Sequence, residues 1–303
     1  MPLLLPELLC PAGDEAALRA AVDSGANAVY LGYRAFGARA SATNFDAEAL
    51  EAAVRYAHLY HVRVYVTVNT LVKPDEMQDL RAALGEIAAT GADAAIVQDL
   101  GVAAMVRREF PALALHASTQ MAICNAEGAR LARSLGFSRV VLARECSLED
   151  AHAVAETGIE TEVFVHGALC TAVSGRCLMS SMSGGRSGNR GRCAQPCRQG
   201  FRMDGMQGPL LSLRDLCLLD DLPVLCASGV RSLKVEGRLK SSEYVAVVTS
   251  VYRRALDAVA QGNFRPDPAQ REQLLQIFNR GGFTRGHILG AEDADLVTPD
   301  RVS

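Results

Sequence analysis

The chain alternates short apolar segments with amphipathic segments of roughly ten to fifteen residues from residue 7 onward. Strands that alternate with helices predict a parallel sheet covered by helices. Eight such units in about 240 residues match an α/β fold of the (β/α)8 TIM-like barrel type. An open doubly wound sheet is the alternative, but no G-x-G-x-x-G motif follows the first strand. The expected strands are Glu7–Cys10, Ala28–Gly32, Val62–Asn69, Ala94–Gln98, Leu113–Ser118, Arg139–Arg144, Glu160–Gly167 and Arg231–Glu236.

The segments between the strands are rich in Ala, Leu, Glu and Arg, as helices are. Asp46, and Asp75 behind Pro74, are residues of the type that caps a helix N-terminus. Glycines stand where helices should end, at Gly25, Gly91, Gly136 and Gly158. The clearest helix candidates are Asp14–Ser24, Asp46–Tyr60, Asp75–Thr90 and Leu148–Glu156.

A long insertion interrupts the pattern, because more than sixty residues separate the seventh strand from the eighth. In a barrel such an insertion emerges at the C-terminal face, where active sites are built. We expect the barrel to span residues 1–262, with a Cys-rich insertion at about 168–209 between strands 7 and 8. Leu210–Leu213 then predicts a short extra strand and Arg214–Leu222 a short helix.

The end of the chain has a different character. Ser241–Gln261 predicts a long helix after the eighth strand. Residues 263–303 are polar and marked by prolines, with one amphipathic helix at Pro268–Phe278. We expect a C-terminal extension without a core of its own, or the start of a further domain in a longer protein.

Four cysteines in the insertion, Cys170, Cys177, Cys193 and Cys197, have the spacing C-x6-C-x15-C-x3-C. The loops between them hold Gly, Ser, Asn and Arg, so the thiols lie on a flexible segment and on no periodic apolar face. Four thiolates suit an iron–sulfur cluster or zinc. Structural zinc usually comes with two C-x2-C knuckles, which are absent, so the irregular gaps favour the cluster. Zinc and free cytosolic thiols are the alternatives.

Arginines surround this cysteine quartet. Guanidinium groups bind phosphates and carboxylates, so the segment predicts a site for RNA phosphates or for a carboxylate substrate. A solvated loop is the alternative. We expect Arg186, Arg190 and Arg192 to point into the same cavity as His166 and Glu236. The candidate substrate-binding residues of this segment are Arg176, Arg186, Arg190, Arg192 and Arg198.

Polar residues also end several strands, and in a barrel such residues face the site. His166 and Glu236 end the seventh and eighth strands and are the candidate catalytic residues. Arg238, Asn69 and Gln120 are candidate substrate-binding residues. The alternative for Glu236 and Arg238 is a structural ion pair. Other strand ends carry Gln98, Asp99, Ser118, Arg144 and Glu145.

Bulk properties exclude several classes of protein. A net charge of −3 argues against a globally basic nucleic-acid coat, although a local basic patch is compatible with it. Nine cysteines without a regular pairing pattern fit a reducing cytosol. No run of 18 apolar residues and no basic leader are present, so we expect a cytoplasmic protein without a membrane span or signal peptide. Hydrolase motifs such as G-x-S-x-G and H-E-x-x-H are absent.

The stretch Glu162–Cys170, together with Ser174–Ser180, resembles the signature of the peptidase U32 family. The resemblance covers nearly the whole chain, and the segment around Cys193 and Cys197 is most similar to the branch that hydroxylates a cytidine of 23S ribosomal RNA. Sister branches hydroxylate tRNA uridine or, without oxygen, ubiquinone precursors. Further matching blocks are Pro6–Gly13, Ala28–Gly32, Gly191–Arg198, Ser232–Ser241 and Phe278–Phe283.

The resemblance implies a barrel fold, a 4Fe–4S cluster and, for the RNA branches, prephenate as an oxygen source. Some ubiquinone-pathway relatives take a ligand from the segment before the eighth strand. Ser232 and its neighbours offer no thiol here, which favours Cys197 as the fourth ligand. Members of the ribosomal branch are usually longer, with further C-terminal domains.

Three functions remain in view. The first is an iron–sulfur enzyme that hydroxylates a base of rRNA or tRNA, with a small carboxylate such as prephenate as a donor. The second is a U32-type, collagenase-like peptidase, which the older family name implies but no motif here explains. The third is a non-catalytic protein that carries a cluster for a partner. The sequence does not determine the RNA, the donor or the oligomeric state.

The ligand assignment leads to a first prediction. Replacing any one of Cys170, Cys177, Cys193 or Cys197 by Ala should lose iron and leave the barrel folded, because a cubane needs all four thiolates. Iron per chain and circular dichroism measure the two effects. Unchanged iron content in Cys197→Ala would show that the fourth ligand is assigned wrongly.

Overall fold

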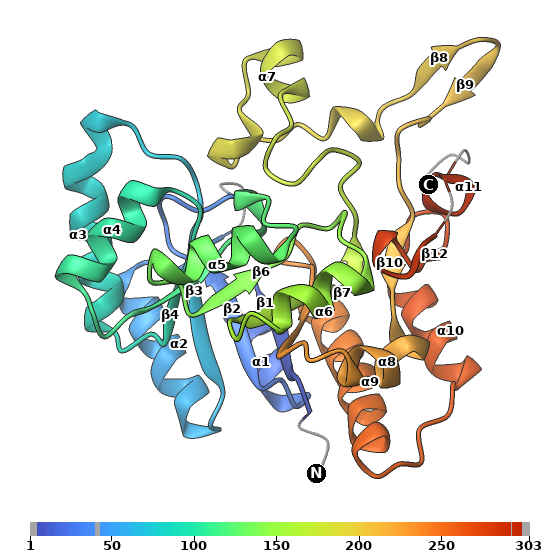
Figure 1. Cartoon of the computed structure of the whole chain (residues 1–303), viewed down its shortest axis with the longest axis horizontal. Helices are drawn as coiled ribbons and strands as arrows, with labels where there is room; N and C mark the ends of the chain where they lie inside the picture. The colour runs from blue at the N-terminus through green and yellow to red at the C-terminus, as the bar shows by residue number, and fades with distance from the viewer. Residues whose placement is uncertain (1–4, 40–42, 292, 299–303) are drawn as a thin grey trace.

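Eight parallel strands close into a barrel in the computed structural model, which describes residues 5–39, 43–291 and 293–298 (Figure 1). The strand β11 pairs with both β1 and β7 and so closes the ring. The expected (β/α)8 fold is therefore confirmed. The barrel strands are β1 (Glu7–Ala12), β2 (Ala28–Gly32), β3 (Arg63–Val68), β4 (Ala94–Val97), β5 (Ala114–Ala117), β6 (Arg139–Val141), β7 (Glu160–Ala168) and β11 (Ser232–Val235).

Helices cover the outside of the barrel, largely where the sequence predicts them. Asp46 caps α2 by accepting a hydrogen bond from the amide of Ala49. The prediction for Asp75 is wrong: it lies inside the 3-10 turn η1 (Pro74–Glu76), and Glu76 precedes α3. The helices are α1 (Glu15–Asp23), α2 (Ala47–Leu59), α3 (Met77–Ala89), α4 (Leu100–Glu109), α5 (Ala126–Ser134), α6 (Leu148–Ala155), α8 (Leu222–Ala227) and α9 (Ser242–Ala260).

Two apolar clusters follow from the alternation of side chains along the strands. Leu31, Val64 and Val66 face outward into the large cluster between the strands and the helices. Tyr30 and Tyr65 face inward, in a small cluster with Leu9, Ala28, Ala94 and Ile96. The barrel lumen is thus filled with side chains, as in other small barrels.

Charged side chains also occupy the lumen. The Arg139 guanidinium lies 2.6 Å from Glu7 and 3.1 Å from Glu162, and the Lys234 ammonium lies 2.8 Å from the other Glu162 oxygen. Tyr65 donates a hydrogen bond to Glu7. These four charged residues come from β1, β6, β7 and β11 and are almost completely buried. They form the lumen ion cluster, which connects four strands across the closure of the barrel.

Near its end, the segment between β7 and β11 adds a strand to the sheet. Strand β10 (Asp215–Cys217) pairs antiparallel with the last residues of β7, from His166 to Ala168. The strand expected at Leu210–Leu213 and the helix expected at Arg214–Leu222 are therefore wrong. Pairing of β7 with β6 ends at Glu162, so backbone groups farther along that edge of β7 need partners, and β10 supplies them from His166 onward. A helix follows only at α8.

The remaining elements of the insertion stand above the barrel at the top of Figure 1. They are the short helix α7 (Met179–Gly184), the turns η3 (Gly188–Arg190) and η4 (Pro196–Arg198), and the hairpin of β8 (Phe201–Met203) and β9 (Met206–Gly208). The hairpin pairs only with itself within the described residues.

The C-terminal segment packs on the same core. It contains α10 (Pro268–Ile277), β12 (Phe283–Thr284), η6 (His287–Leu289) and α11 (Asp293–Leu296). Strand β12 pairs with β10, and Leu274 and Ile288 are buried in the large apolar cluster. Within the described ranges, no helix has an apolar stretch long enough to cross a membrane.

The lumen ion cluster leads to a prediction about acid stability. Burial raises the pKa of Glu162, but Lys234 and Arg139 outweigh it and lower the pKa from 4.5 to about 2. A folded-state pKa below the unfolded value stabilises the fold above that unfolded value. The free energy of unfolding should therefore fall as the pH drops from 4.5 to about 2.

Glu162→Gln should lower the free energy of unfolding at pH 7 by about 3–5 kcal/mol, because it breaks a buried ion pair on one side. It should also flatten the acid dependence. Urea titrations between pH 2 and 7 measure both effects, with Glu127→Gln on the surface of α5 as the control. Equal slopes for Glu162→Gln and the unaltered protein would contradict the assignment.

Candidate functional site

A cavity of about 310 Å³ opens at the carboxyl ends of the barrel strands, beneath the insertion. Thr67 of β3, Asn69 directly after β3 and Ser118 after β5 line one part of it. Arg144 after β6 and Glu236 after β11 line another, and all four cysteines of the quartet complete the lining. The cavity therefore lies where barrel enzymes place their active sites.

The cysteine quartet is held near the cavity by backbone contacts that require glycine. Gly175 has φ +71°, and a Cβ atom there would lie 2.1 Å from the carbonyl oxygen of Gln120. Gly191 has φ +74° and would meet the carbonyl oxygen of Gly37 at 2.6 Å. These two close approaches seat the segments that carry Cys177 and Cys193 against the barrel loops.

Polar side chains fix the same segments. Ser174 donates to the Glu145 carboxylate at 2.9 Å and accepts from the Arg144 amide at 3.2 Å. Arg198 donates to the carbonyl oxygens of Leu169 and Leu213. The insertion is therefore tied to the barrel on both sides of the quartet.

The four thiols of the quartet are free and accessible to different degrees. Cys170 and Cys193 are exposed, and Cys177 and Cys197 are half-buried. The Cys193 sulfur accepts from the Gln195 amide at 3.4 Å and from the Ser180 hydroxyl at 3.8 Å. Burial and the three neighbouring cysteines raise the pKa of Cys197, whereas Arg198 lowers it.

The donor chemistry of the quartet fits an iron–sulfur cluster or zinc, since four soft ligands line one cavity on glycine-rich loops. In the described part of the chain, no three Cys, His, Asp or Glu side chains close on one point as a finished metal site. Holding a metal would therefore draw the loops of the insertion together.

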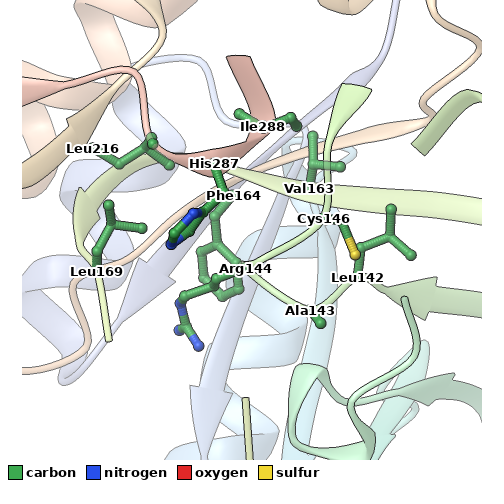
Figure 2. Close-up of a pocket in the computed structure, with 11 residues that line it drawn as sticks. Leu142, Ala143, Arg144, Cys146, Val163, Phe164, Leu169, Leu216, His287 and Ile288 are labelled. Atoms are coloured by element: carbon green, nitrogen blue, oxygen red, sulfur yellow. The ribbon is translucent and has the colours of Figure 1, made fainter. Parts of the chain in front are cut away.

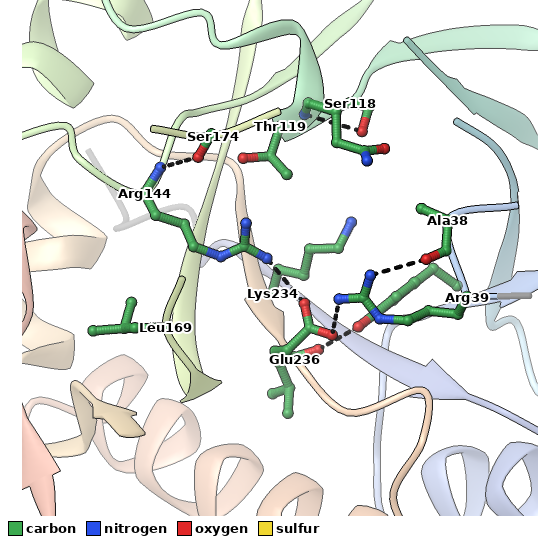
Figure 3. A network of polar contacts seen from close by, with 12 residues as sticks. Ala38, Arg39, Ser118, Thr119, Arg144, Leu169, Ser174, Lys234 and Glu236 are labelled. Carbon is green, nitrogen blue, oxygen red and sulfur yellow. Dashed lines mark hydrogen bonds and ion pairs between the residues drawn. The ribbon is translucent and has the colours of Figure 1, made fainter. Parts of the chain in front are cut away.

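Glu236 lies between two arginines at the floor of the cavity (Figure 3). One carboxylate oxygen is 3.2 Å from Arg39 and the other 3.0 Å from Arg144. Burial raises the pKa of Glu236, but Arg39, Arg144 and Arg238 together lower it to about 2. The expected alternative, an ion pair between Glu236 and Arg238, is wrong. Glu236 pairs with Arg39 and Arg144, and Arg238 donates to the Thr67 hydroxyl.

Arg144 also stacks on an aromatic ring. Its guanidinium lies 4.1 Å from the centroid of Phe164, and Figure 2 shows the two side chains beside His287 and Ile288 of the C-terminal segment. The small cavity among these residues has a volume of about 20 Å³, room for about one water molecule. The residues around it pack against Arg144, and the space is too small for a ligand larger than water.

His166 is turned away from the cavity. Its ring packs 5.5 Å from both Tyr252 of α9 and Phe283 of β12, and burial together with Lys240 lowers its pKa to about 3. The register of β7 and β11 shifts between Lys234 and Val235, so that Val235 pairs with His166. Such a bulge re-aims the side chains that follow it, and simple alternation along the strand missed it.

The arginines of the insertion divide into two groups. Arg198 lines the cavity, whereas Arg176, Arg186, Arg190 and Arg192 are outside its lining. The expectation that Arg186, Arg190 and Arg192 point into the same cavity as His166 and Glu236 is therefore wrong. Arg190 binds the Glu76 carboxylate, and Arg186 donates to the carbonyl of Arg192 at 3.1 Å. These contacts shape the insertion.

Asn69 and Gln120 do line the cavity, as the sequence predicts. Asn69 accepts from the Ala38 amide at 2.9 Å and donates to the Ser118 hydroxyl at 3.4 Å. The side-chain oxygen of Gln120 is buried without a hydrogen-bond partner within the described residues. In Figure 3 Ser118 and Thr119 lie across from Lys234 and Glu236, so the cavity has an uncharged polar wall facing a charged one.

The sequence did not single out four cations of the cavity. Lys234 is two residues before Glu236 on β11, and strand alternation could have identified it. Arg39 comes from the loop after β2, and Lys240 and Arg280 come from after β11 and from the C-terminal segment. Burial and Arg280 lower the pKa of Lys240 to about 8.

Positive charge dominates the cavity. Counting described residues only, seven cationic side chains and one carboxylate, Glu236, line it. Glu162 and Asp215, which bind Lys234 and Arg280 from outside the lining, leave an excess of positive charge. The cationic lining residues are Arg39, Arg144, Arg198, Lys234, Arg238, Lys240 and Arg280.

Comparison with known proteins adds a family and several relatives. The model of Peptidase family U32 matches residues 13–298. The 23S rRNA 5-hydroxycytidine C2501 synthase of Escherichia coli is 41% identical over 263 residues, which cover 84% of this chain and 40% of that protein. The tRNA hydroxylation protein P1 of Bacillus subtilis is 38% identical, over 91% of this chain and 69% of its own length.

Another relative is named for proteolysis and not for RNA modification. A protein of Porphyromonas gingivalis named collagenase is 34% identical over 94% of this chain and 73% of its own length. Among solved structures, the U32 peptidase Mk0906 matches 77% of this chain and 94% of its own at 15% identity, with a TM-score of 0.53. That likeness supports the fold alone. This chain spans less than half of the Escherichia coli relative.

Thiol exposure leads to a prediction. In metal-free protein, iodoacetamide should modify the exposed Cys124, Cys170 and Cys193 rapidly and the half-buried Cys177 and Cys197 at an intermediate rate. The buried cysteines should react slowly, since burial raises the pKa of Cys10 and Cys146 to about 12.

After reconstitution with iron and sulfide, the four quartet thiols should be protected as ligands. Cys124 should then be the one thiol of these five that is still modified rapidly. Peptide mass spectrometry over a time course measures the pattern. Rapid modification of all four quartet thiols in protein with bound iron would exclude them as its ligands.

Proposed function

Because this chain belongs to peptidase family U32, we propose that it takes part in RNA modification as an enzyme that hydroxylates a base of rRNA or tRNA. The proposal rests first on the relatives: one is named an rRNA 5-hydroxycytidine synthase and several are named tRNA hydroxylation proteins. The cytidine of 23S rRNA is the favoured substrate, since the relative of that name is 41% identical. Such a reaction would take place in the cytoplasm, where these RNAs are.

One observation of the structure carries the proposal. The cysteine quartet, an uncharged polar wall and an excess of positive charge line a single cavity at the catalytic face of a barrel. RNA is polyanionic, and a base that enters an enzyme is read through hydrogen bonds to its edge. The cavity offers both kinds of contact beside a set of metal-binding thiols.

We assign Cys170, Cys177, Cys193 and Cys197 as the ligands of a 4Fe–4S cluster, with zinc as the alternative. A bound cluster would supply one-electron chemistry at the mouth of the cavity. Arg198, one residue after Cys197 and in the cavity lining, offsets the negative charge of the thiolates. Its three donated hydrogen bonds hold it in that place.

The uncharged wall suits a nucleobase. The amide of Asn69 is oriented by the Ala38 amide, and the unpartnered oxygen of Gln120 is available to accept from an exocyclic amino group. Glu236 binds Arg39 and Arg144 with both oxygens, and its pKa of about 2 keeps it ionised at neutral pH. We therefore assign Glu236 to the positioning of these two arginines and not to proton transfer. His166 is assigned a packing role.

The oxygen atom must come from a second substrate. The excess of positive charge fits a small carboxylate, and prephenate is the candidate that the family resemblance suggests. Arg39 and Arg144 present guanidinium groups to the cavity with one side of each neutralised by Glu236. Both remain able to donate further hydrogen bonds to a carboxylate.

The second candidate function is a peptidase, which the name of the Porphyromonas gingivalis relative suggests. The cavity offers it little support, since among the described residues no histidine lines it beside the quartet thiols to act as their base. A cluster-carrying accessory protein would need the same thiols but not the polar wall.

Deletion of the gene should abolish one hydroxylated pyrimidine in total RNA. Nucleoside mass spectrometry of rRNA and tRNA from the deletion strain measures this loss. Complementation with the unaltered gene or with Cys124→Ala should restore the nucleoside, whereas Cys177→Ala and Asn69→Ala should reduce it at least about tenfold, a change of about 1.4 kcal/mol.

An unchanged set of nucleosides in the deletion strain would rule out the hydroxylase. Restoration by Asn69→Ala but not by Cys177→Ala would favour the accessory protein. Cleavage of denatured collagen by purified protein, lost in Cys177→Ala, would favour the peptidase.

A further inference from the structure

Arg238 is a buried cation whose charge is not balanced within the cavity. Arg238 is 5% exposed and lines the cavity from the loop after β11. Nη1 donates to the Thr67 hydroxyl at 2.9 Å. Across the described ranges, no carboxylate lies within ion-pair distance of its guanidinium. Buried charges in proteins are normally paired or bound to a ligand.

The Glu236 carboxylate attracts Arg238 but does not pair with it. Glu236 uses one oxygen for Arg39 and the other for Arg144. Burial and the Arg39 guanidinium lower the pKa of Arg238 to about 10, and the attraction of Glu236 does not compensate for them. The charged form of Arg238 is therefore destabilised by burial and by Arg39, and an anion bound in the cavity would stabilise it.

Glycine at position 32 makes room for this guanidinium and for the Asn44 side chain. A Cβ atom there would lie 2.3 Å from Nη1 of Arg238 and 2.2 Å from Oδ1 of Asn44. Thr67, which receives the one hydrogen bond, is itself oriented by donating to the carbonyl of Leu31. The side chain is thus seated between β2 and β3 with most of its donors unused.

We propose that Arg238 anchors the carboxylate of a small-molecule ligand at the inner end of the cavity. The planar fork of a guanidinium matches the two oxygens of a carboxylate. Arg238 is 5% exposed and lines the cavity, so the compact carboxylate of a small molecule suits it better than a phosphate that carries a ribose on each side.

The use of this subsite in oxygen transfer rests on the proposed function, whereas the subsite itself does not. Its test is therefore direct binding without RNA. If no carboxylate binds, the proposed RNA hydroxylation is still tested separately by nucleoside analysis. If the deletion strain keeps all its hydroxylated nucleosides, a carboxylate measured at Arg238 by calorimetry still stands.

The experiment measures binding to the full chain by isothermal titration calorimetry at pH 7. The probes are prephenate and phenylpyruvate, with the methyl ester of phenylpyruvate as the neutral control and with inorganic phosphate and cytidine monophosphate as other anions. We expect at least one of the carboxylates to bind and the ester not to bind. Arg238→Gln should weaken carboxylate binding at least tenfold, and Arg202→Gln on the β8–β9 hairpin should not.

A second readout separates this role from a structural one. Removing an unbalanced buried charge should leave the ligand-free thermal midpoint of Arg238→Gln equal to or above that of the unaltered protein. The carboxylate should then no longer raise the midpoint. Arg238→Lys, which keeps the charge but replaces the planar fork by a single ammonium group, should also weaken binding and decides the matter if Arg238→Gln does not fold.

Several outcomes would overturn the proposal. They are failure of both carboxylates to bind the unaltered protein, equal binding by Arg238→Gln, or, where that variant does not fold, equal binding by Arg238→Lys. Binding of phosphate or cytidine monophosphate through Arg238, without carboxylate binding, would replace the carboxylate by a phosphate.

Discussion

The lumen ion cluster of Glu7, Arg139, Glu162 and Lys234 is the interaction on which the rest of the structure depends. It joins β1, β6, β7 and β11, the strands that meet where the barrel closes. Buried ion pairs gain little net free energy over apolar packing, but breaking one costs about 3–5 kcal/mol. The cluster therefore enforces one register at the closure, and that register sets which side chains reach the cavity.

Lys234 connects this cluster to the functional site. Its ammonium is held by Glu162 and lies 4.3 Å from the centroid of the Tyr30 ring, yet the residue also lines the cavity. Two residues later, just after β11 ends, Glu236 holds Arg39 and Arg144. Two charged residues at the end of β11 thus build the floor of the cavity. An enclosed site with fixed charges needs little rearrangement when an anion binds.

The site is assembled from segments with different mechanical roles. The barrel strands and the residues directly after them supply rigid positions for Thr67, Asn69 and Glu236. The insertion supplies thiols on glycine-rich loops, which can adjust around a metal. The C-terminal segment adds Arg280, which binds Asp215 of β10 at 2.9 Å. Because β10 pairs with β7 and β12, the insertion and the C-terminal segment are bound to one another through the sheet.

The sequence by itself determined the barrel, its eight strands, the place of the insertion and the spacing of the quartet, because these depend on local periodicity and on order along the chain. It also identified Asn69, Gln120, Glu236 and Arg238 as strand-end residues of the cavity. Tertiary structure alone decided which charges meet. The bulge between β7 and β11 turned His166 outward, Glu76 took Arg190, and Glu236 paired with Arg39 and Arg144. Those outcomes depend on register and on contacts between distant segments, which no local pattern of residues records.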